Sequence, residues 1–102
     1  MTDETLTGLR AEIDAIDTAI VALLARRFAV VDRVIVVKER DGLPALLPER
    51  VEEVVARVRA AAAAAGVPAE AAESVWRALI SQTIIYEETV LGARSAPGPQ
   101  DA

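Results

Sequence analysis

Apolar residues recur at alternating intervals of three and four along the first part of this chain. The stripe comprises Leu6, Leu9, Ile13, Ile16, Ile20 and Leu23, and the same spacing continues through Val30, Val34 and Val37. This spacing follows one face of an α-helix, and it passes unbroken through the valine-rich stretch 30–37, which argues against a strand there. No Pro precedes Pro44, so the pattern predicts one helix from about Leu6 that ends near Gly42.

Two shorter helices are predicted in the rest of the chain. After the loop "DGLPALLP", Pro48 suits the first turn of a helix that ends near Gly66. Its apolar side consists of Val51, Val54, Val55 and Val58. A third helix is predicted from Pro68 to about Gly92, and its inward residues are Val75, Trp76, Leu79, Ile80, Ile84, Val90 and Leu91. We therefore expect one helical domain over residues 1–92 and a disordered tail over 93–102, because "ARSAPGPQDA" is rich in Pro, Gly and Ser.

The first helix is long for so small a chain. Some 34 residues, each rising about 1.5 Å, would span about 50 Å. A compact globule of about 100 residues has a radius of gyration of only about 13 Å. Such a helix extends beyond any core that this chain can build alone. The sequence therefore predicts an all-α fold of three helices that forms an intertwined homodimer, in which a second copy covers the overhanging stripe.

The composition excludes several kinds of function. A net charge of −5 disfavours a broad nucleic-acid surface, and the absence of Cys and His removes thiol chemistry and the usual transition-metal ligands. No apolar run reaches the roughly 20 residues of a membrane span, and the first residues lack the pattern of a signal peptide. We expect a cytoplasmic protein that uses no metal or other cofactor and has no nucleic-acid or membrane partner.

Several polar residues occupy positions where apolar ones are expected. Arg27 lies on the apolar stripe of the first helix, and Lys38 lies eleven residues further on, beside the same stripe. On the third helix, Glu87 falls on the apolar side, and Thr83 lies four residues before it. Because burying an unpaired charge is costly, these groups either pair with each other, for example as an Arg27–Glu87 ion pair, or hold a charged ligand.

The other arginines differ in their expected surroundings. A row repeating every seven residues is expected on a solvated face, and it consists of Arg26, Arg33 and Arg40. Arg50 lies in the first turn of the second helix, where the helix dipole disfavours a cation, so it either gathers an anion or is a simple surface residue. Arg10 lies seventeen residues before Arg27, about 100° round the helix, so it can reach the pocket of a partner more easily than its own.

These residues occur within a recognisable set of motifs. They are "LRAEIDAID", "LLARR", a lysine eleven residues after the second arginine of that motif, and "PERV", whose arginine follows the lysine by twelve. From about Leu6 to Leu91, the chain resembles the all-helical class of chorismate mutases, a family of intertwined dimers of three-helix chains. The resemblance implies a pocket for a small dicarboxylate, with Arg10 supplied by the partner and the rest by one chain: Arg27, Lys38, Arg50, Thr83 and Glu87.

The chemistry that the resemblance implies is a [3,3] rearrangement of an enolpyruvyl cyclohexadiene. No proton must move and no covalent intermediate is needed, so the site supplies positioning and charge stabilisation. The implied catalytic residues are Arg27, Lys38 and Glu87. Arginines clamp two carboxylates, while Lys38 and Glu87 hydrogen-bond the ether oxygen, where negative charge grows. Only a protonated Glu87 carboxyl can donate such a bond.

Two positions expected to bind substrate depart from the family. Typical members carry an acid three residues before the arginine of the second helix and a Glu just after it, and both meet the ring hydroxyl. Here these positions are Leu47 and Val51. Rearrangement of chorismate or of 4-amino-4-deoxychorismate is therefore our first interpretation. The second is the isochorismate pyruvate lyase reaction, whose enzymes carry Gln at the position of Glu87, and the third is a non-enzymatic helical dimer.

Overall fold

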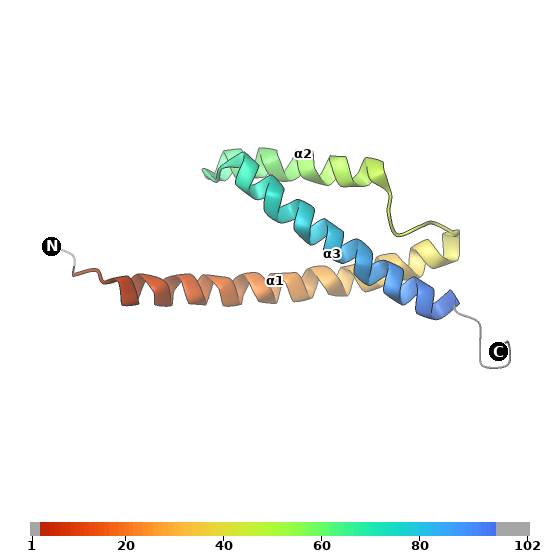
Figure 1. Ribbon diagram of the computed structural model, residues 1–102, viewed down its shortest axis with the longest axis horizontal. Coiled ribbons are helices and arrows are strands. Elements are labelled where there is room, and N and C mark those ends of the chain that lie inside the picture. The colour runs from red at the N-terminus through yellow and green to blue at the C-terminus, as the bar shows by residue number, and fades with distance from the viewer. Residues whose placement is uncertain (1–2, 96–102) are drawn as a thin grey trace.

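The computed structural model describes residues 3–95 of the chain. These residues form three helices and no strand: α1 (Leu6–Asp41), α2 (Pro48–Ala65) and α3 (Ala69–Ser95) (Figure 1). The predicted all-α class and the three predicted helices are confirmed. Within this part of the chain, no helix combines the length and the apolar content that a membrane crossing requires.

Two glycines end helices through the same backbone geometry. Gly42 and Gly66 have φ angles of 68° and 77°, in the left-handed region, which a residue without Cβ adopts at little steric cost. The N–H of Leu43 then donates to the carbonyl of Lys38 at 2.8 Å, and an equivalent bond follows Gly66. The predicted helix ends near Gly42 and Gly66 are therefore confirmed.

The third helix departs from its predicted end. α3 passes through Gly92 and continues to Ser95. Gly92 does not adopt the left-handed conformation that ends the other two helices, and a glycine in a helical conformation does not stop the helix. The prediction of an end near Gly92 was wrong. Of the expected disordered tail, residues 93–95 belong to α3, and residues 96–102 lie outside the described part of the chain.

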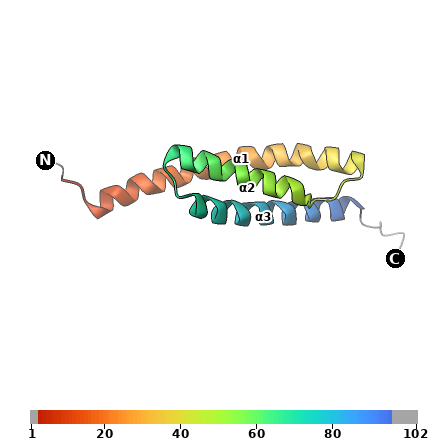
Figure 2. The same cartoon turned by 90° about the horizontal axis from the view of Figure 1, so that it is seen from above.

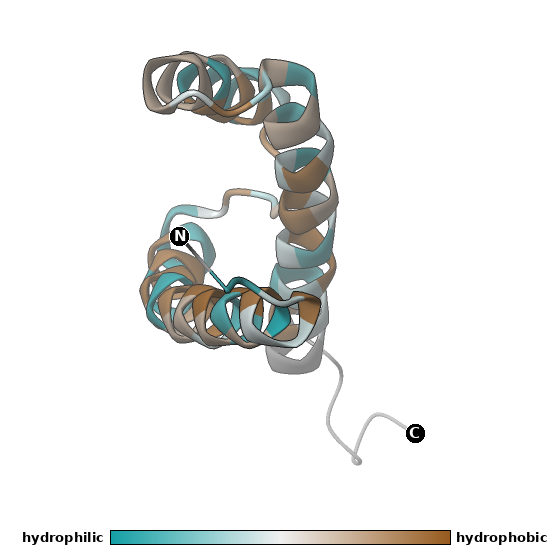
Figure 3. Ribbon diagram, turned by 90° about the vertical axis from the view of Figure 1, so that its left-hand side faces the viewer, coloured by the Kyte–Doolittle hydropathy of each residue, from teal (hydrophilic) through white to brown (hydrophobic). Residues whose placement is uncertain are grey.

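α3 is the helix that joins the fold together, because it packs against both α1 and α2. Seen end on, α1 and α2 form the two arms of a C whose back is α3 (Figure 3). The N-terminal end of α1 extends well beyond the hairpin of α2 and α3 (Figures 1 and 2). The molecule measures 71 × 29 × 18 Å with a radius of gyration of 18.7 Å, so the 36-residue α1 overhangs the core as predicted.

The contact between α1 and α3 buries a short row of α1. Val31, Ile35 and Lys38 are buried at intervals of four and three residues, and Ile35 is 0% exposed. The predicted apolar stripe runs beside this row, and its residues from Leu6 to Leu23 are exposed. α1 therefore has one face buried within the chain and one apolar face that no other described residue covers.

Side chains on the outer faces test two further predictions. Val75 was predicted to point inward but is 60% exposed, because neither α1 nor α2 covers its side of α3. The predicted solvated row is exposed as expected, and it consists of Arg26, Arg33 and Arg40.

A network of ion pairs, exposed at Glu52 and Arg77 and half-buried at Arg59 and Glu73, links α2 to α3. Arg77 of α3 binds both oxygens of Glu52 of α2, at 3.0 and 3.1 Å, and also contacts Glu73 at 2.7 Å. Arg59 of α2 reaches the same Glu73 at 2.7 Å. Hydrogen bonds from Arg77 lower the pKa of Glu52, and those from Arg77 and Arg59 lower the pKa of Glu73. Because water screens these groups, they contribute little to stability.

Candidate active site

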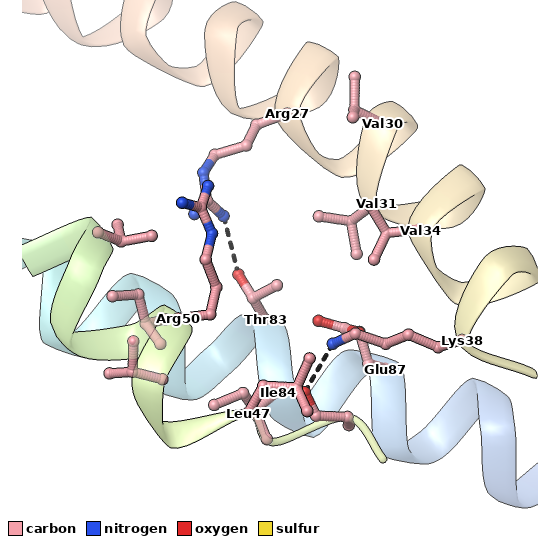
Figure 4. A pocket seen from close by; sticks show the side chains of 14 residues that line it. Arg27, Val30, Val31, Val34, Lys38, Leu47, Arg50, Thr83, Ile84 and Glu87 are labelled. Atoms are coloured by element: carbon pink, nitrogen blue, oxygen red, sulfur yellow. Dashed lines mark hydrogen bonds and ion pairs between the residues drawn. The ribbon is translucent and has the colours of Figure 1, made fainter. Parts of the chain in front are cut away.

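A cavity of about 520 Å³ lies between α1 on one side and α2 and α3 on the other (Figure 4). The side chains that line it are Arg27, Val30, Val31, Val34, Lys38, Ala45, Leu47, Arg50, Val51, Val54, Ile80, Thr83, Ile84 and Glu87. Most of this lining is aliphatic. Three cations, one carboxyl and one hydroxyl therefore face an otherwise apolar space.

The fold brings together most of the residues that the sequence singled out. Seven of them line the cavity: Arg27, Lys38, Leu47, Arg50, Val51, Thr83 and Glu87. Arg10 does not, because it is exposed on the overhanging N-terminal end of α1, about 25 Å along the helix axis from Arg27. Its place in the pocket of a partner chain stays a prediction.

Arg27 is held by α3 through a hydroxyl group. Its Nη1 donates to Thr83 Oγ1 at 3.1 Å, and Thr83 Oγ1 in turn donates to the carbonyl of Leu79, one turn earlier in α3, at 2.8 Å. Thr83 is buried and Arg27 is half-buried. This arrangement fixes one end of the guanidinium group and leaves its other N–H groups for a ligand.

Lys38 and Glu87 form a buried ion pair across the same cavity. Lys38 Nζ donates to Glu87 Oε1 at 2.8 Å, and the two side chains are only 11% and 7% exposed. Lys38 Nζ also donates to the backbone carbonyl of Ala45, in the loop between α1 and α2, at 2.7 Å. The two partners satisfy two of the three N–H groups of the ammonium. The Arg27–Glu87 pair considered from the sequence was therefore wrong, since Lys38 binds Glu87.

Arg50 lies at the rim of the cavity in the first turn of α2, and its side chain points toward Arg27 (Figure 4). Its Nη1 donates to Glu53 Oε1, one turn further along α2, at 2.6 Å, and both side chains are exposed. The Glu53 carboxylate offsets the unfavourable placement of a cation at the positive end of the helix. With five N–H groups, the guanidinium can still donate to a ligand carboxylate beside Glu53.

The aliphatic wall of the cavity is the part of the site that sequence reasoning missed. It comprises Val30, Val31, Val34, Ala45, Val54, Ile80 and Ile84. Ile80 and Ile84 were predicted to point inward, and their position beside Thr83 on the same side of α3 could have placed them in the site. Ala45 gave no signal, because its contribution is a backbone carbonyl in a loop. Leu47 and Val51 form an apolar corner of the wall beside Arg50.

The arrangement suits a small dianion with an apolar body. Arg27 and Arg50 face each other as two sites for carboxylates, and Lys38 offers a further N–H deeper in the cavity. The residues described contain no cluster of acidic side chains that could hold a metal ion, and the chain has no Cys or His. The side chains present can orient a ligand and stabilise negative charge on it.

Comparison with known proteins places this geometry in a family. The family model described as chorismate mutase type II matches residues 9–88, a range that includes all eight residues expected to bind substrate. A T-protein of Enterobacter agglomerans is 42% identical over 82 residues, which cover 80% of this chain and 22% of that protein. A T-protein of Haemophilus influenzae is 36% identical over 84 residues, covering 82% and 22%. The chain thus spans about a fifth of the length of these relatives, and the resemblance seen in its sequence is confirmed.

Proposed function

We propose that this chain, which belongs to the chorismate mutase type II family of isomerases, rearranges chorismate to prephenate by a [3,3] shift. In this reaction the ether C–O bond of the substrate breaks while a C–C bond forms between its two fragments, and no group passes to the protein. The observation that carries the proposal is the convergence of three cations on one small apolar cavity. Such a cavity provides the orientation and the charge stabilisation that the rearrangement needs.

Arg27 and Arg50 are the groups that bind the two carboxylates of the substrate. They approach the cavity from opposite walls, and each can form two parallel hydrogen bonds to a carboxylate (Figure 4). Holding both ends fixes the enolpyruvyl arm over the ring, which brings the two reacting carbons together. The aliphatic wall then excludes water from the remaining surface of the substrate.

Lys38 stabilises the charge that grows on the ether oxygen. Glu87 and the Ala45 carbonyl occupy two of its N–H groups, so the third is left for the substrate, in a direction that the two fixed partners determine. Because this charge appears mainly in the transition state, the bond from Lys38 strengthens as the C–O bond breaks. Glu87 orients Lys38 when it is ionised, and it donates to the same oxygen only when it is protonated.

The working enzyme is a homodimer in which Arg10 completes the pocket of the partner. Two features support this assembly: the apolar stripe of α1 is exposed in the single chain, and Arg10 is too far from the cavity of its own chain. Mixing inactive Arg10→Ala chains with inactive Arg27→Ala chains should restore activity, because one pocket of the heterodimer carries neither change. If subunit exchange is demonstrated and no activity returns, Arg10 does not act on the partner.

The apolar corner of Leu47 and Val51 favours a second candidate substrate, 4-amino-4-deoxychorismate. Neither side chain can hydrogen-bond the ring hydroxyl of chorismate. On binding, this hydroxyl would therefore lose its hydrogen bonds to water without gaining others from Leu47 or Val51. Glu87 is the one carboxyl among the residues that line the cavity, and an ionised carboxyl can retain a cationic amino group. The same cations and the same rearrangement apply to both substrates.

One set of incubations decides between these functions. The protein is supplied separately with chorismate, 4-amino-4-deoxychorismate and isochorismate, and the products are separated by chromatography. A rearranged product from either of the first two supports the proposal and names the substrate. Salicylate and pyruvate from isochorismate would indicate the lyase, and no product from any of the three would indicate a non-enzymatic dimer. A Leu47→Asp/Val51→Glu variant should raise kcat/KM on chorismate, because it restores acids that can meet the hydroxyl.

A further inference from the structure

We infer that Tyr86 is a positioning residue, which fixes how far α1 is shifted along α3 and thereby holds Lys38 against Glu87. The consequence for catalysis rests on the proposed function, whereas the geometry that suggests it belongs to the free protein. The observation is a pair of contacts from Tyr86 of α3 to α1. Its hydroxyl donates to Asp32 Oδ1, and its ring meets that of Phe28 edge to face, with the ring centroids 5.2 Å apart. Together, Phe28, Asp32 and Tyr86 form a clasp between the two helices.

The clasp lies beside the α1–α3 contact, outside the cavity, since none of its three residues lines that cavity. Phe28 directly follows Arg27 in the sequence, and Tyr86 directly precedes Glu87. Neighbouring residues of a helix point about 100° apart, so in each of these two pairs one side chain reaches the cavity and the other reaches the clasp. The contacts of the clasp therefore do not compete with a ligand for the groups that bind it.

The clasp restricts sliding between the two helices more closely than the rest of their contact does. The buried row of α1 is aliphatic at Val31 and Ile35, and hydrophobic contact has no preferred direction. The bond from a phenol to a carboxylate is directional and charge-assisted, and an edge-to-face ring pair has a preferred geometry of its own. Sliding α1 along α3 would break both contacts of the clasp, whereas the aliphatic row would only exchange one apolar neighbour for another.

The offset between the helices matters most at Lys38, because its ammonium is held by partners on two other segments. Nζ donates to Glu87 Oε1 of α3 at 2.8 Å and to the Ala45 carbonyl in the loop after α1 at 2.7 Å. Asp32 precedes Lys38 by six residues, about 9 Å along α1, and Tyr86 adjoins the Glu87 end of the pair. A shift of about 1 Å at the clasp would therefore change the direction of the N–H group that is left for the substrate.

The kinetic test removes the hydrogen bond of the clasp from each end. Tyr86→Phe keeps the ring pair, and it should lower kcat about three- to tenfold with a change in KM of about twofold or less, because Lys38 acts mainly in the transition state. Asp32→Ala should cause a similar loss of kcat. Asp32→Asn keeps an oxygen that can accept the bond from Tyr86, so it should recover most of this loss.

Glu52→Gln is the matched control for a general loosening of the fold. Like Asp32, Glu52 is exposed and binds a residue of α3, but it does so from α2, through Arg77. It should leave kcat unchanged. A Tyr86→Phe/Asp32→Ala double variant should lose about as much kcat as either single variant, because both changes remove the same bond. An equal loss in Glu52→Gln, or additive losses in the double variant, would show that the clasp does not position the site.

Lys38 offers a readout on the free protein that does not depend on catalysis, because it is the only lysine in the sequence. Its buried ammonium, bonded to two acceptors, should give a single slowly exchanging signal in nitrogen-15 NMR spectra of wild type and Glu52→Gln. This signal should shift and weaken in Tyr86→Phe and Asp32→Ala. If wild type turns over none of the substrates, the proposed function fails, and these spectra still decide whether the clasp positions Lys38. An unchanged Lys38 signal in Tyr86→Phe would overturn the inference.

Discussion

The two halves of α1 share one helix and one apolar spacing, but their surroundings differ. In the N-terminal half, the stripe from Leu6 to Leu23 is regular and uninterrupted, and it is exposed. In the C-terminal half, Arg27 interrupts the stripe and Lys38 lies beside it, and both turn toward polar partners on α3. A regular stripe without a partner thus indicates assembly, whereas an interrupted stripe with buried polar partners indicates a ligand site. Substitutions in each half of α1 separate these two roles.

The largest expected effect is at the buried end. Lys38→Ala should lower kcat by about 10²- to 10³-fold with a much smaller change in KM, because the bond from Lys38 matters most in the transition state. Lys38→Arg should restore only part of the lost kcat, since a planar guanidinium cannot replace a compact ammonium between Glu87 and the Ala45 carbonyl. Steady-state kinetics measure both. A Lys38→Ala/Glu87→Gln variant controls for the buried carboxylate left without its partner, and unchanged turnover in Lys38→Ala would remove Lys38 from the site.

The next effect concerns the exposed half. Ile16→Asp should raise the dimer dissociation constant by about 10- to 100-fold, because it would bury a charge in the interface between the two copies. Val75→Asp is the matched control, since Val75 is 60% exposed and Ile16 59%, but Val75 lies outside the stripe. Sedimentation equilibrium compares the two variants. Equal dissociation in both would mean that the stripe has no special part in assembly.

Glu87→Gln tests the buried pair from its acidic side. On chorismate, the loss in kcat/KM should be about tenfold or less, because an amide loses the charge attraction to Lys38 but can itself donate to the ether oxygen. On 4-amino-4-deoxychorismate the loss should be larger, because the variant cannot retain a cationic amino group. Parallel assays on both substrates measure the ratio. Identical kinetics for wild type and variant would show that Glu87 points elsewhere when the substrate is bound.

The smallest effect is expected at the ion pairs between α2 and α3. The folded pKa values of Glu52 and Glu73 lie below their ordinary value of 4.5, so their stabilisation is present above that pH and is lost as pH falls through the lowered values. Glu73→Gln should therefore lower Tm slightly at neutral pH and not at all in strong acid. Thermal unfolding followed by circular dichroism gives the difference. A difference in Tm between wild type and Glu73→Gln that grew on acidification would contradict the predicted pH dependence.

Most of the fold could be predicted because its signals are local. Helix spacing and the glycines after the first two helices gave the ends at Gly42 and Gly66, each of which depends on one residue that tolerates a positive φ. Gly92 is also a glycine, but it does not adopt a positive φ, so the predicted end of α3 was wrong. Whether Val75 is covered depends on the directions from which α1 and α2 approach α3. The residue pattern of a single helix does not specify these directions.

The candidate site was predictable in its members but not in its pairing. Polar residues on apolar faces identified Arg27, Lys38, Thr83 and Glu87, because an inward charge needs a partner. Which cation binds Glu87 depends on how far α1 is shifted along α3, and this offset has no local signal. The contribution of Ala45 could not be predicted for a different reason. Every residue has a backbone carbonyl, so the sequence does not mark the one that binds Lys38.

That carbonyl has a consequence for how the chain tolerates mutation. Lys38 is directed by an atom that no side-chain substitution can remove, so replacing residues 43–46 one at a time with others that fit should leave the acceptor in place. The position of the acceptor instead depends on the number of residues between Gly42 and Pro48. Inserting or deleting one of them would move the oxygen away from the ammonium while leaving every ionisable group unchanged. For this loop, the number of residues matters more for the position of the acceptor than the identity of each residue does.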